Sequence, residues 1–229
     1  HTSQGDPWAK PSGALQVAQR QRSVGSSLWS ALKSPALATP EGPGKPDWAQ
    51  RGAGSEVVHA LTSPTFTPPD ATLWQRSMGW LGVENGLGVP EDAISADTAL
   101  GHCWPMAGTN GSLTVRLGTP LVVEAISLDH VGRSEALDTS SAPFHFQAFG
   151  LSDLSPNAQE MCMVQGKYEL EGPAVQTFRA ASVMVRRPFR YVRLQIDNNH
   201  GNADYTCLYR LRVHGFAPAK VQRGDTNSP

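Results

Sequence analysis

Apolar side chains alternate with polar ones in several short stretches between Ser112 and Phe216. Leu113, Val115 and Leu117 alternate in SLTVRL, and RYVRLQID, FHFQAFG and LYRLRVHG show the same period of two. Residues two apart on a strand share one face, so each stretch predicts a strand with one buried side. Loops rich in glycine and proline separate the stretches, and no long helical segment intervenes. The pattern therefore predicts an all-β fold, an antiparallel β-sandwich of the jelly-roll type.

The rest of the chain predicts tails around this domain. Residues 1–46 are poor in large apolar side chains and end in ATPEGPGKP, which is typical of a linker with at most a short helix. We expect the domain at 47–217 and a second tail at 218–229. Residues 64–97 carry many glycines and prolines together with two tryptophans, so they predict a long excursion from the sandwich.

Composition and charge argue against several classes of function. The 19 Lys and Arg nearly balance the 20 Asp and Glu, and no basic stripe is interleaved with aromatic residues, so a nucleic-acid partner is not expected. No apolar run is long enough to span a membrane, so attachment to one is expected only through a segment outside this chain. We find no spaced acid pair, nucleophile–base set or phosphate loop, which argues against an enzyme.

Three cysteines, Cys103, Cys162 and Cys207, are too few for a disulfide scaffold and fit no paired zinc motif. They could be buried thiols. In an oxidising compartment, an odd number would leave one thiol for an outside partner. The triplet NGS, which begins at Asn110 in an expected turn, is a candidate glycosylation site and points toward such a compartment.

The last strand-like stretch, DYTCLYRLRVHGF, is unusual. Its spacing places Tyr205, Cys207 and Tyr209 on one face, followed on the same face by Leu211 and Val213. The second half is an ordinary half-buried strand. The first half aligns two phenol rings and a thiol, and phenols that share a face can converge on one ligand.

Four segments resemble successive motifs of one known family. They are DWAQRGAGSEVV, GHCWPMAGTNGSLTVRL, the pair LDHV and SSAPFHFQAFGL, and YTCLYRLRVHG. All four are similar to parts of the SUN domain, the C-terminal module of Sad1/UNC-84 type nuclear-envelope proteins. The resemblance runs from about Asp47 to Gly215, and the last motif is the most specific of the four.

The resemblance implies a fold, a place and a partner. SUN domains are β-sandwiches that usually form trimers, and as parts of inner nuclear membrane proteins they stand in the perinuclear lumen. There they bind the C-terminal peptide of KASH proteins of the outer nuclear membrane, which makes the LINC bridge to the cytoskeleton. We therefore expect a homotrimer with a KASH-type partner. Residues 64–97 lie where the family has a lid over the peptide, so Trp74 and Trp80 are expected lid residues.

The resemblance also suggests which residues bind the peptide. Tyr205 and Tyr209 map onto family tyrosines that help to capture the terminal carboxylate. The segment QTFR places Arg179 at what we take as the third pocket position, where a guanidinium could pair with a carboxylate through two hydrogen bonds. A preference for a different partner sequence, or a purely structural arginine, are the alternatives.

For the cysteines, the resemblance implies a covalent link. Cys103 maps onto the cysteine that in many members forms an intermolecular disulfide with the KASH peptide; an unreactive buried thiol is the alternative. Cys162 and Cys207 could pair with each other, although a sequence does not give their separation. His102 is not expected to act as a base beside Cys103, because neighbouring strand residues point to opposite faces.

A cation is the only cofactor that the resemblance suggests, and none is required. The loop GRSEALDTS, between Val131 and Ser140, occupies the place of the family's cation loop, which folds around a monovalent ion such as potassium or sodium. Its ligands are largely backbone carbonyls. The carboxylates of Glu135 and Asp138 are compatible with a cation, because hard cations prefer oxygen ligands.

Two other functions stay open. Jelly rolls often bind carbohydrate at their loop ends, where Trp74 or Trp80 could stack on a sugar ring. The chain could also be an architectural SUN-like module of a larger assembly, without a free peptide ligand. Tryptophans exposed at the tip of the sandwich would favour sugar, whereas tryptophans folded over Tyr205 and Tyr209 would favour a lid.

Overall fold

The computed structural model describes residues 45–69, 71, 88–132, 135, 138–181 and 187–218. The short helix expected in the first tail lies outside these residues, as does most of the tail after 217. No helix within the described ranges is long and apolar enough to cross a membrane.

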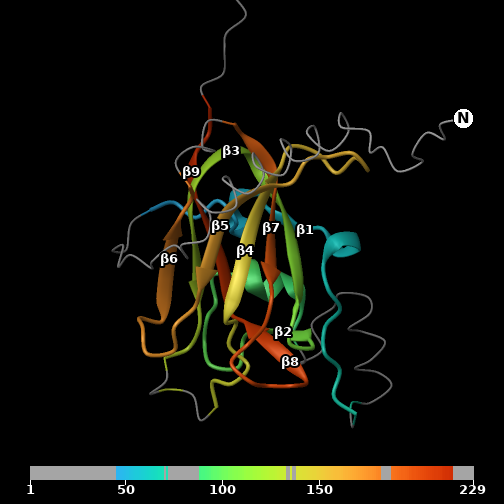
Figure 1. The fold of residues 1–229 in the computed structure, drawn as a ribbon, viewed down its shortest axis with the longest axis vertical. Helices are drawn as coiled ribbons and strands as arrows, with labels where there is room; N and C mark the ends of the chain where they lie inside the picture. The colour runs from blue at the N-terminus through green and yellow to red at the C-terminus, as the bar shows by residue number, and fades with distance from the viewer. Residues whose placement is uncertain are drawn as a thin grey trace, which may run out of the picture. The chain divides into compact units, whose positions relative to one another are not determined.

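The described chain is built from strands and short 3-10 helices (Figure 1). In chain order they are η1 (Arg51–Ala53), β1 (Glu56–Val57), η2 (His59–Leu61), η3 (Pro90–Ile94), β2 (Trp104–Ala107), β3 (Gly111–Asp129), β4 (His145–Leu151), β5 (Met161–Lys167), β6 (Val175–Arg179), β7 (Phe189–Ile196), β8 (Tyr205–Leu208) and β9 (Arg210–Phe216). Every strand pairing among them is antiparallel. The predicted all-β sandwich is confirmed.

The long strand β3 joins the two layers of the sandwich. Its first half pairs with β1 and β7, and its second half pairs with β6 and β9. The pairing with β7 shifts register between Arg116 and Leu121. Gly118 lies in this interval, where a Cβ would come within 2.2 Å of the carbonyl oxygen of Ala53, and Pro120 there has no N–H to donate. The strand therefore bends at this point and crosses from one layer to the other.

The strand order β1-β3-β7-β4-β5 forms one layer, and β6 and β9 flank the second half of β3 in the other. The pair β2 and β8 forms a separate two-stranded sheet at one end of the molecule, the lower end in Figure 1. This small sheet carries part of the terminal motif, so that end of the sandwich is where the candidate site lies.

The hydrophobic core lies between the layers, as the alternating pattern predicts. Leu113, Val115 and Leu117 on β3 are each at most 1% exposed. Val192 and Leu194 on β7 are fully buried and pair in register with this row of side chains. Burial of such side chains stabilises the fold by about 1.5–3 kcal/mol each, so the two central strands hold the sandwich together.

The two ends of the domain meet on β9. The carboxylate of Asp47 lies 2.7 Å from a guanidinium nitrogen of Arg210, and its other oxygen accepts a hydrogen bond from the backbone of Val213. The backbone N–H of Trp48 donates to the carbonyl of Val213, and its indole N–H donates to that of Gly215. The segment that begins at Asp47 thus packs against the terminal motif.

Both described ends of residues 64–97 pack against the body of the domain. Thr65 forms a β-bridge with Met106, and the N–H of Phe66 donates to the carbonyl of Pro105. At the other end, Ala93 and Ile94 are fully buried in the main core. Most of the segment between these ends lies outside the described residues, so the excursion stays a prediction. The expected lid residues, Trp74 and Trp80, lie outside the described residues.

Candidate functional site

The terminal motif forms two strands and not one. β8 pairs with β2, whereas β9 pairs with β3, and Tyr209 is the residue between them. Leu211 and Val213 lie in the main core, as the alternation predicts. Cys207 and Tyr209 belong instead to a second, smaller cluster with Cys103. The chain changes partner strand at Tyr209, so Cys207 and Tyr209 pack in this smaller cluster, whereas Leu208 stays in the main core.

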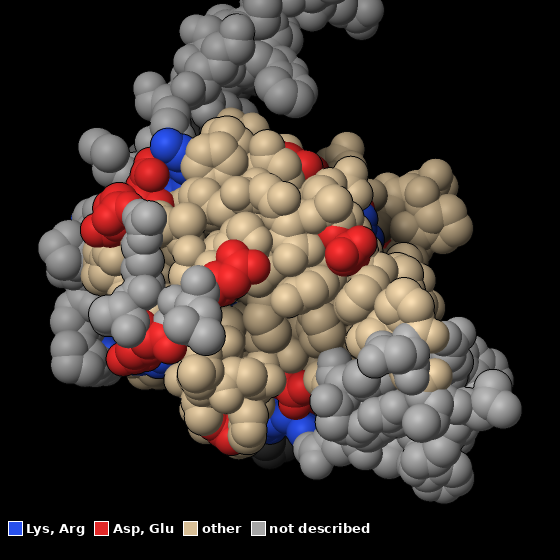
Figure 2. Space-filling view, turned by 90° about the horizontal axis from the view of Figure 1, so that it is seen from below, with Lys and Arg blue, Asp and Glu red and all other residues tan. Residues whose placement is uncertain are grey.

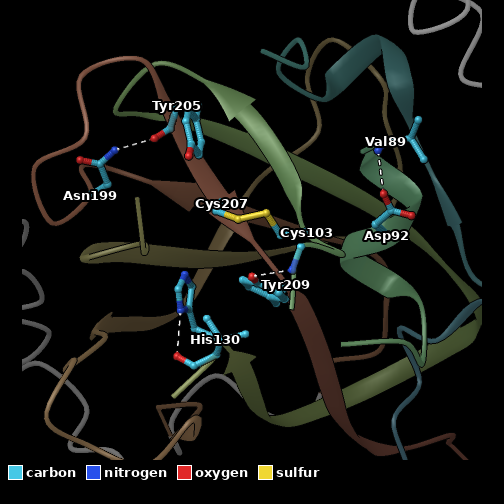
Figure 3. The surroundings of a disulfide bond; sticks show 10 residues. Val89, Asp92, Cys103, His130, Asn199, Tyr205, Cys207 and Tyr209 are labelled. Carbon is cyan, nitrogen blue, oxygen red and sulfur yellow. Dashed lines mark hydrogen bonds between the residues drawn. A yellow bond between two sulfur atoms is a disulfide. The ribbon is translucent and has the colours of Figure 1, made fainter. Parts of the chain in front are cut away.

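A disulfide between Cys103 and Cys207 lies at the centre of the second cluster, with Cα atoms 5.6 Å apart (Figure 3). The register of β2 and β8 places Cys207 opposite Pro105, so Cys103, two residues before Pro105, lies diagonally across from Cys207. The structure therefore corrects the expectation that Cys103 is bonded to a partner peptide, since its sulfur is already bonded within the chain.

Cys162 does not pair with Cys207 either. It lies on β5, where the register places it opposite Phe149 in the large sheet, and it is a free, half-buried thiol. Burial raises the pKa of this thiol above its usual value. A raised pKa reduces the fraction of reactive thiolate at neutral pH, so Cys162 is the less reactive kind of cysteine.

Tyr205 lies on one side of the disulfide. Its half-buried ring stacks on Phe66, with ring centroids 5.3 Å apart. The side chain of Asn199 donates to the carbonyl of Tyr205 at 3.1 Å, and the backbone N–H of Tyr205 donates to the side chain of Asn202. These bonds fix the start of β8, and no described residue is a hydrogen-bond partner of the Tyr205 hydroxyl.

Tyr209 lies on the other side of the disulfide, together with His130 (Figure 3). Tyr209 is only 4% exposed, and its hydroxyl oxygen accepts a hydrogen bond of 3.3 Å from the backbone N–H of Gly101. The rings of His130 and Tyr209 meet edge to face, with centroids 4.9 Å apart. Since the hydroxyl of Tyr209 acts as an acceptor for Gly101, its own proton can still be donated, and no described residue accepts it.

His130 has an unused hydrogen-bonding atom inside the protein. Its side chain is buried, Nδ1 lies 3.2 Å from the carbonyl oxygen of Val131, and the buried Nε2 has no partner among the described residues. Burial is the main cause that lowers the pKa of His130 below its usual 6.5, and the nearby His200 lowers it further. A buried polar atom without a partner is costly, so Nε2 marks a position where a ligand atom would be stabilised.

Sequence reasoning missed His130 as a site residue. The segment LDHV resembles a family strand, but the resemblance assigns no role to its histidine. The signal was present, because Asp129 and His130 lie at the end of a predicted core strand. A histidine in that position is a candidate binding or catalytic residue.

Arg179, by contrast, does not lie with the tyrosines. It ends β6, exposed, opposite Ala125 of β3. Tyr209 directly precedes the residue that pairs with Asp129 on the other edge of β3. Positions 125 and 129 are separated by roughly 13 Å along a strand. The structure therefore does not bring Arg179 to the tyrosines, and His130 is the side chain that lies beside Tyr209.

The predicted cation loop is described only in part. The carbonyl of Val131 is a hydrogen-bond partner of His130, and the carboxylate of Asp138 accepts bonds from the backbone and hydroxyl of Ser140. Those bonds lower the pKa of Asp138, the backbone bond most. Glu135 is exposed. Within the described ranges no three His, Cys, Asp or Glu side chains form a group that could hold a metal, so a cation in this loop stays a prediction.

Figure 2 views the molecule from the end that carries β2 and β8. The described surface of this face is mostly uncharged, with scattered acidic side chains and few basic ones. A surface of this kind offers no long-range attraction for an anionic ligand. A carboxylate bound here would have to be held by local hydrogen-bond donors.

Comparison with known families identifies the domain. Residues 85–217 match the family model described as Sad1 / UNC-like C-terminal. The chain belongs to this SUN domain family. The expected family resemblance is therefore confirmed. Asp47 lies upstream of the matched residues and forms an ion pair with Arg210, which lies within them.

Several curated proteins are similar to this SUN domain. SUN domain-containing protein 2 of Arabidopsis thaliana is 38% identical over 117 residues, which cover 50% of this chain and 26% of that protein. Klaroid protein of Drosophila melanogaster is 35% identical over 57% of this chain and 14% of its own length. Human SUN domain-containing protein 3 is 33% identical over 63% of this chain and 40% of its own length. The chain thus spans well under half of each of these relatives.

Solved structures with the same fold include modules of carbohydrate-active proteins. A putative chitobiase fragment from Bacteroides thetaiotaomicron matches with a TM-score of 0.54 and 11% identity, over 80% of this chain and 98% of that one. A family 32 carbohydrate-binding module from Clostridium perfringens matches with a TM-score of 0.50 and 13% identity, over 75% and 95%. At such identities the likeness shows the jelly-roll fold alone.

Proposed function

We propose that this SUN domain binds the C-terminal tail of a KASH-type protein of the outer nuclear membrane and so links the nucleus to the cytoskeleton. The observation that carries the proposal is a pair of buried polar groups with unused hydrogen-bonding capacity beside the second cluster. They are the buried Nε2 of His130 and the hydroxyl proton of Tyr209, on rings 4.9 Å apart.

A peptide terminus suits this pair of groups. A carboxylate offers two oxygens that only accept hydrogen bonds, and charged acceptors form the stronger bonds. One oxygen can accept from the Tyr209 hydroxyl. Nδ1 of His130 donates to the carbonyl of Val131, so Nε2 has a proton for the other oxygen only when the imidazole is charged, a state that a bound carboxylate favours. Because the described part of this face has few basic side chains, we expect these local donors, with Tyr205 on the far side of the disulfide, to supply the recognition.

The disulfide supports the pocket mechanically. Cys207 lies between Tyr205 and Tyr209 in the chain, and its bond to Cys103 fixes the strand that carries the first tyrosine and leads into the second. The backbone N–H of Cys207 also donates to the carbonyl of Ser141 at 2.8 Å. A pocket held in its binding conformation loses less entropy when a flexible tail enters it.

We place the domain in the perinuclear lumen, as part of an inner nuclear membrane protein anchored through a segment outside this chain. An intrachain disulfide is expected in an oxidising compartment and not in the cytosol, which supports this placement. A homotrimer and a monovalent cation near the pocket belong to the same proposal by family resemblance. The proposal does not depend on a covalent bond between the chain and its partner.

The proposal is tested by affinity capture from nuclear-envelope extract. Wild type is compared with Tyr209→Phe, Tyr209→Ala and His130→Ala, and with Tyr191→Phe as a matched control on β7. Wild type and Tyr191→Phe should capture a membrane protein with a lumenal C-terminal tail, and the three pocket variants should lose it. Identical partners with all five proteins would overturn the pocket, and capture of none by wild type would favour an architectural module.

A further inference from the structure

The connection between β2 and β3 carries the one N-x-S/T triplet without an intervening proline in the 229-residue sequence, Asn110-Gly111-Ser112. Asn110 is exposed, and no described residue is a hydrogen-bond partner of its side chain. Two residues before Asn110, Gly108 has a φ of 80°, a backbone conformation that favours glycine in turns. The side-chain amide of Asn110 is therefore exposed and makes no hydrogen bond with a described residue.

A second, independent observation points to the same chemistry. The disulfide between Cys103 and Cys207 requires a compartment in which thiols are oxidised. In eukaryotic cells the lumen that permits disulfides is also where asparagine-linked oligosaccharides are added. The triplet and the disulfide therefore both fit a chain that folds in such a lumen.

We propose that Asn110 carries an N-linked oligosaccharide and that it is added before β3 closes against residues 61–63. In the transfer, the amide nitrogen of Asn110 forms a bond to C1 of a lipid-pyrophosphate-linked oligosaccharide. The bond between C1 and the pyrophosphate oxygen breaks, the lipid pyrophosphate leaves with that electron pair, and the amide loses one proton. The donor and the transferase are supplied by the lumen.

The timing follows from the contacts of Ser112, the third residue of the triplet. In the folded domain its hydroxyl donates to the carbonyl of Leu61 at 3.4 Å, its N–H donates to the hydroxyl of Ser63 at 2.9 Å, and its carbonyl accepts from the N–H of Ser63 at 2.8 Å. On its other edge it pairs with Gln195 of β7. A transferase that must bind the Ser112 hydroxyl can do so only before these contacts form, because afterwards they occupy it.

The middle residue is fixed by packing. A Cβ at Gly111 would lie 2.6 Å from both the sulfur of Met106 and the hydroxyl of Ser63. The folded chain therefore has no room for a side chain at Gly111. The inference shares the oxidising lumen with the proposed function but does not depend on peptide binding.

The site is tested by expressing the full chain behind a secretory signal in eukaryotic cells and measuring its intact mass before and after an asparagine glycosidase. Wild type, Ser112→Thr and Asn157→Gln, a matched exposed asparagine outside any triplet, should each lose mass on digestion. Asn110→Gln should not. Secreted wild type that has formed the disulfide but has the mass of bare polypeptide would overturn the site, whatever the peptide-binding result.

The timing is tested with unglycosylated chain and microsomes that contain the transferase and its lipid-linked donor. Chain that is reduced and unfolded should be modified at Asn110, and the same chain folded and oxidised should not. Equal modification of both forms would contradict addition before folding. No modification of the unfolded chain would overturn the site itself.

Discussion

The ring of His130, at the end of β3, meets the ring of Tyr209, at the junction of β8 and β9, edge to face at 4.9 Å. Neither side chain uses all of its hydrogen-bonding capacity within the described residues. The hydroxyl of Tyr209 accepts from Gly101 and keeps a proton to donate, and Nε2 of His130 has no partner. Two well-buried polar rings at this end of the sandwich thus each keep a group that could form a further hydrogen bond.

Replacing Tyr209 with phenylalanine should weaken peptide binding strongly and the fold only slightly. The ring stays and continues to pack on His130, but the hydroxyl that accepts from Gly101 is lost, which costs about 1 kcal/mol of unfolding free energy. We expect affinity for the partner tail to fall by about tenfold or more, or about 1.4 kcal/mol. Calorimetric titration checks this, with Tyr191→Phe as control, and an unchanged affinity would contradict the pocket.

Removing the disulfide should destabilise the domain, because both of its cysteines belong to the same chain. We expect Cys103→Ala combined with Cys207→Ala to lower the free energy of unfolding by roughly 2–4 kcal/mol, because the bond closes a long loop of the unfolded chain. Cys162→Ala should have a much smaller effect. Guanidinium unfolding measures both.

The thiols can be counted separately in the wild type. Alkylation of denatured, unreduced chain should label only Cys162, since the other two are bonded to each other. Labelling of Cys103 under these conditions would contradict the intrachain bond.

The ion pair between Asp47 and Arg210 should be essential to the fold. Both side chains are 8% exposed, so removing one partner leaves a buried charge. We expect Asp47→Ala to lower the free energy of unfolding by roughly 3–5 kcal/mol. The matched control, Glu56→Gln, breaks a solvent-exposed pair with Arg116 and should change stability little. Similar effects of the two substitutions in guanidinium unfolding would contradict the structural role of Asp47.

His130 should make the domain less stable in mild acid. Its pKa is lower in the folded state than its usual 6.5, so the unfolded chain binds more protons as the pH falls. The stability it contributes is present above the unfolded pKa and is lost as the pH falls through the folded pKa. Unfolding of wild type and His130→Gln at several pH values on both sides of 6.5 tests this. The variant should show a shallower loss, and equal pH dependence would argue against a buried neutral histidine.

Local patterns predicted the strands well, because a strand with one buried side has an apolar residue at every second position of the sequence. Leu113, Val115 and Leu117 are buried as the alternation requires, and so is Leu211. The same local reasoning failed for DYTCLYRLRVHGF. Nothing in its alternation shows that the chain changes partner strand at Tyr209, since that depends on where β2 and β3 lie.

The site was harder to predict than the fold, since it depends on contacts between distant segments. Cys103 and Cys207 are 104 residues apart, and spacing alone gave no reason to pair them. Arg179 matched a family segment in sequence, yet the register of β6 on β3 places it away from the tyrosines. His130 comes to Tyr209 only because β9 lies beside the second half of β3.

The central claim is that the pocket recognises a peptide's free terminal carboxylate. Two synthetic peptides with the C-terminal sequence of the captured partner, one ending in a carboxylate and one in a carboxamide, are titrated into wild type, Tyr209→Phe and Tyr191→Phe. Wild type and Tyr191→Phe should bind the carboxylate at least about tenfold more tightly than the amide, or about 1.4 kcal/mol, and Tyr209→Phe should lose most of that preference. Equal affinity of wild type for both peptides would contradict the account.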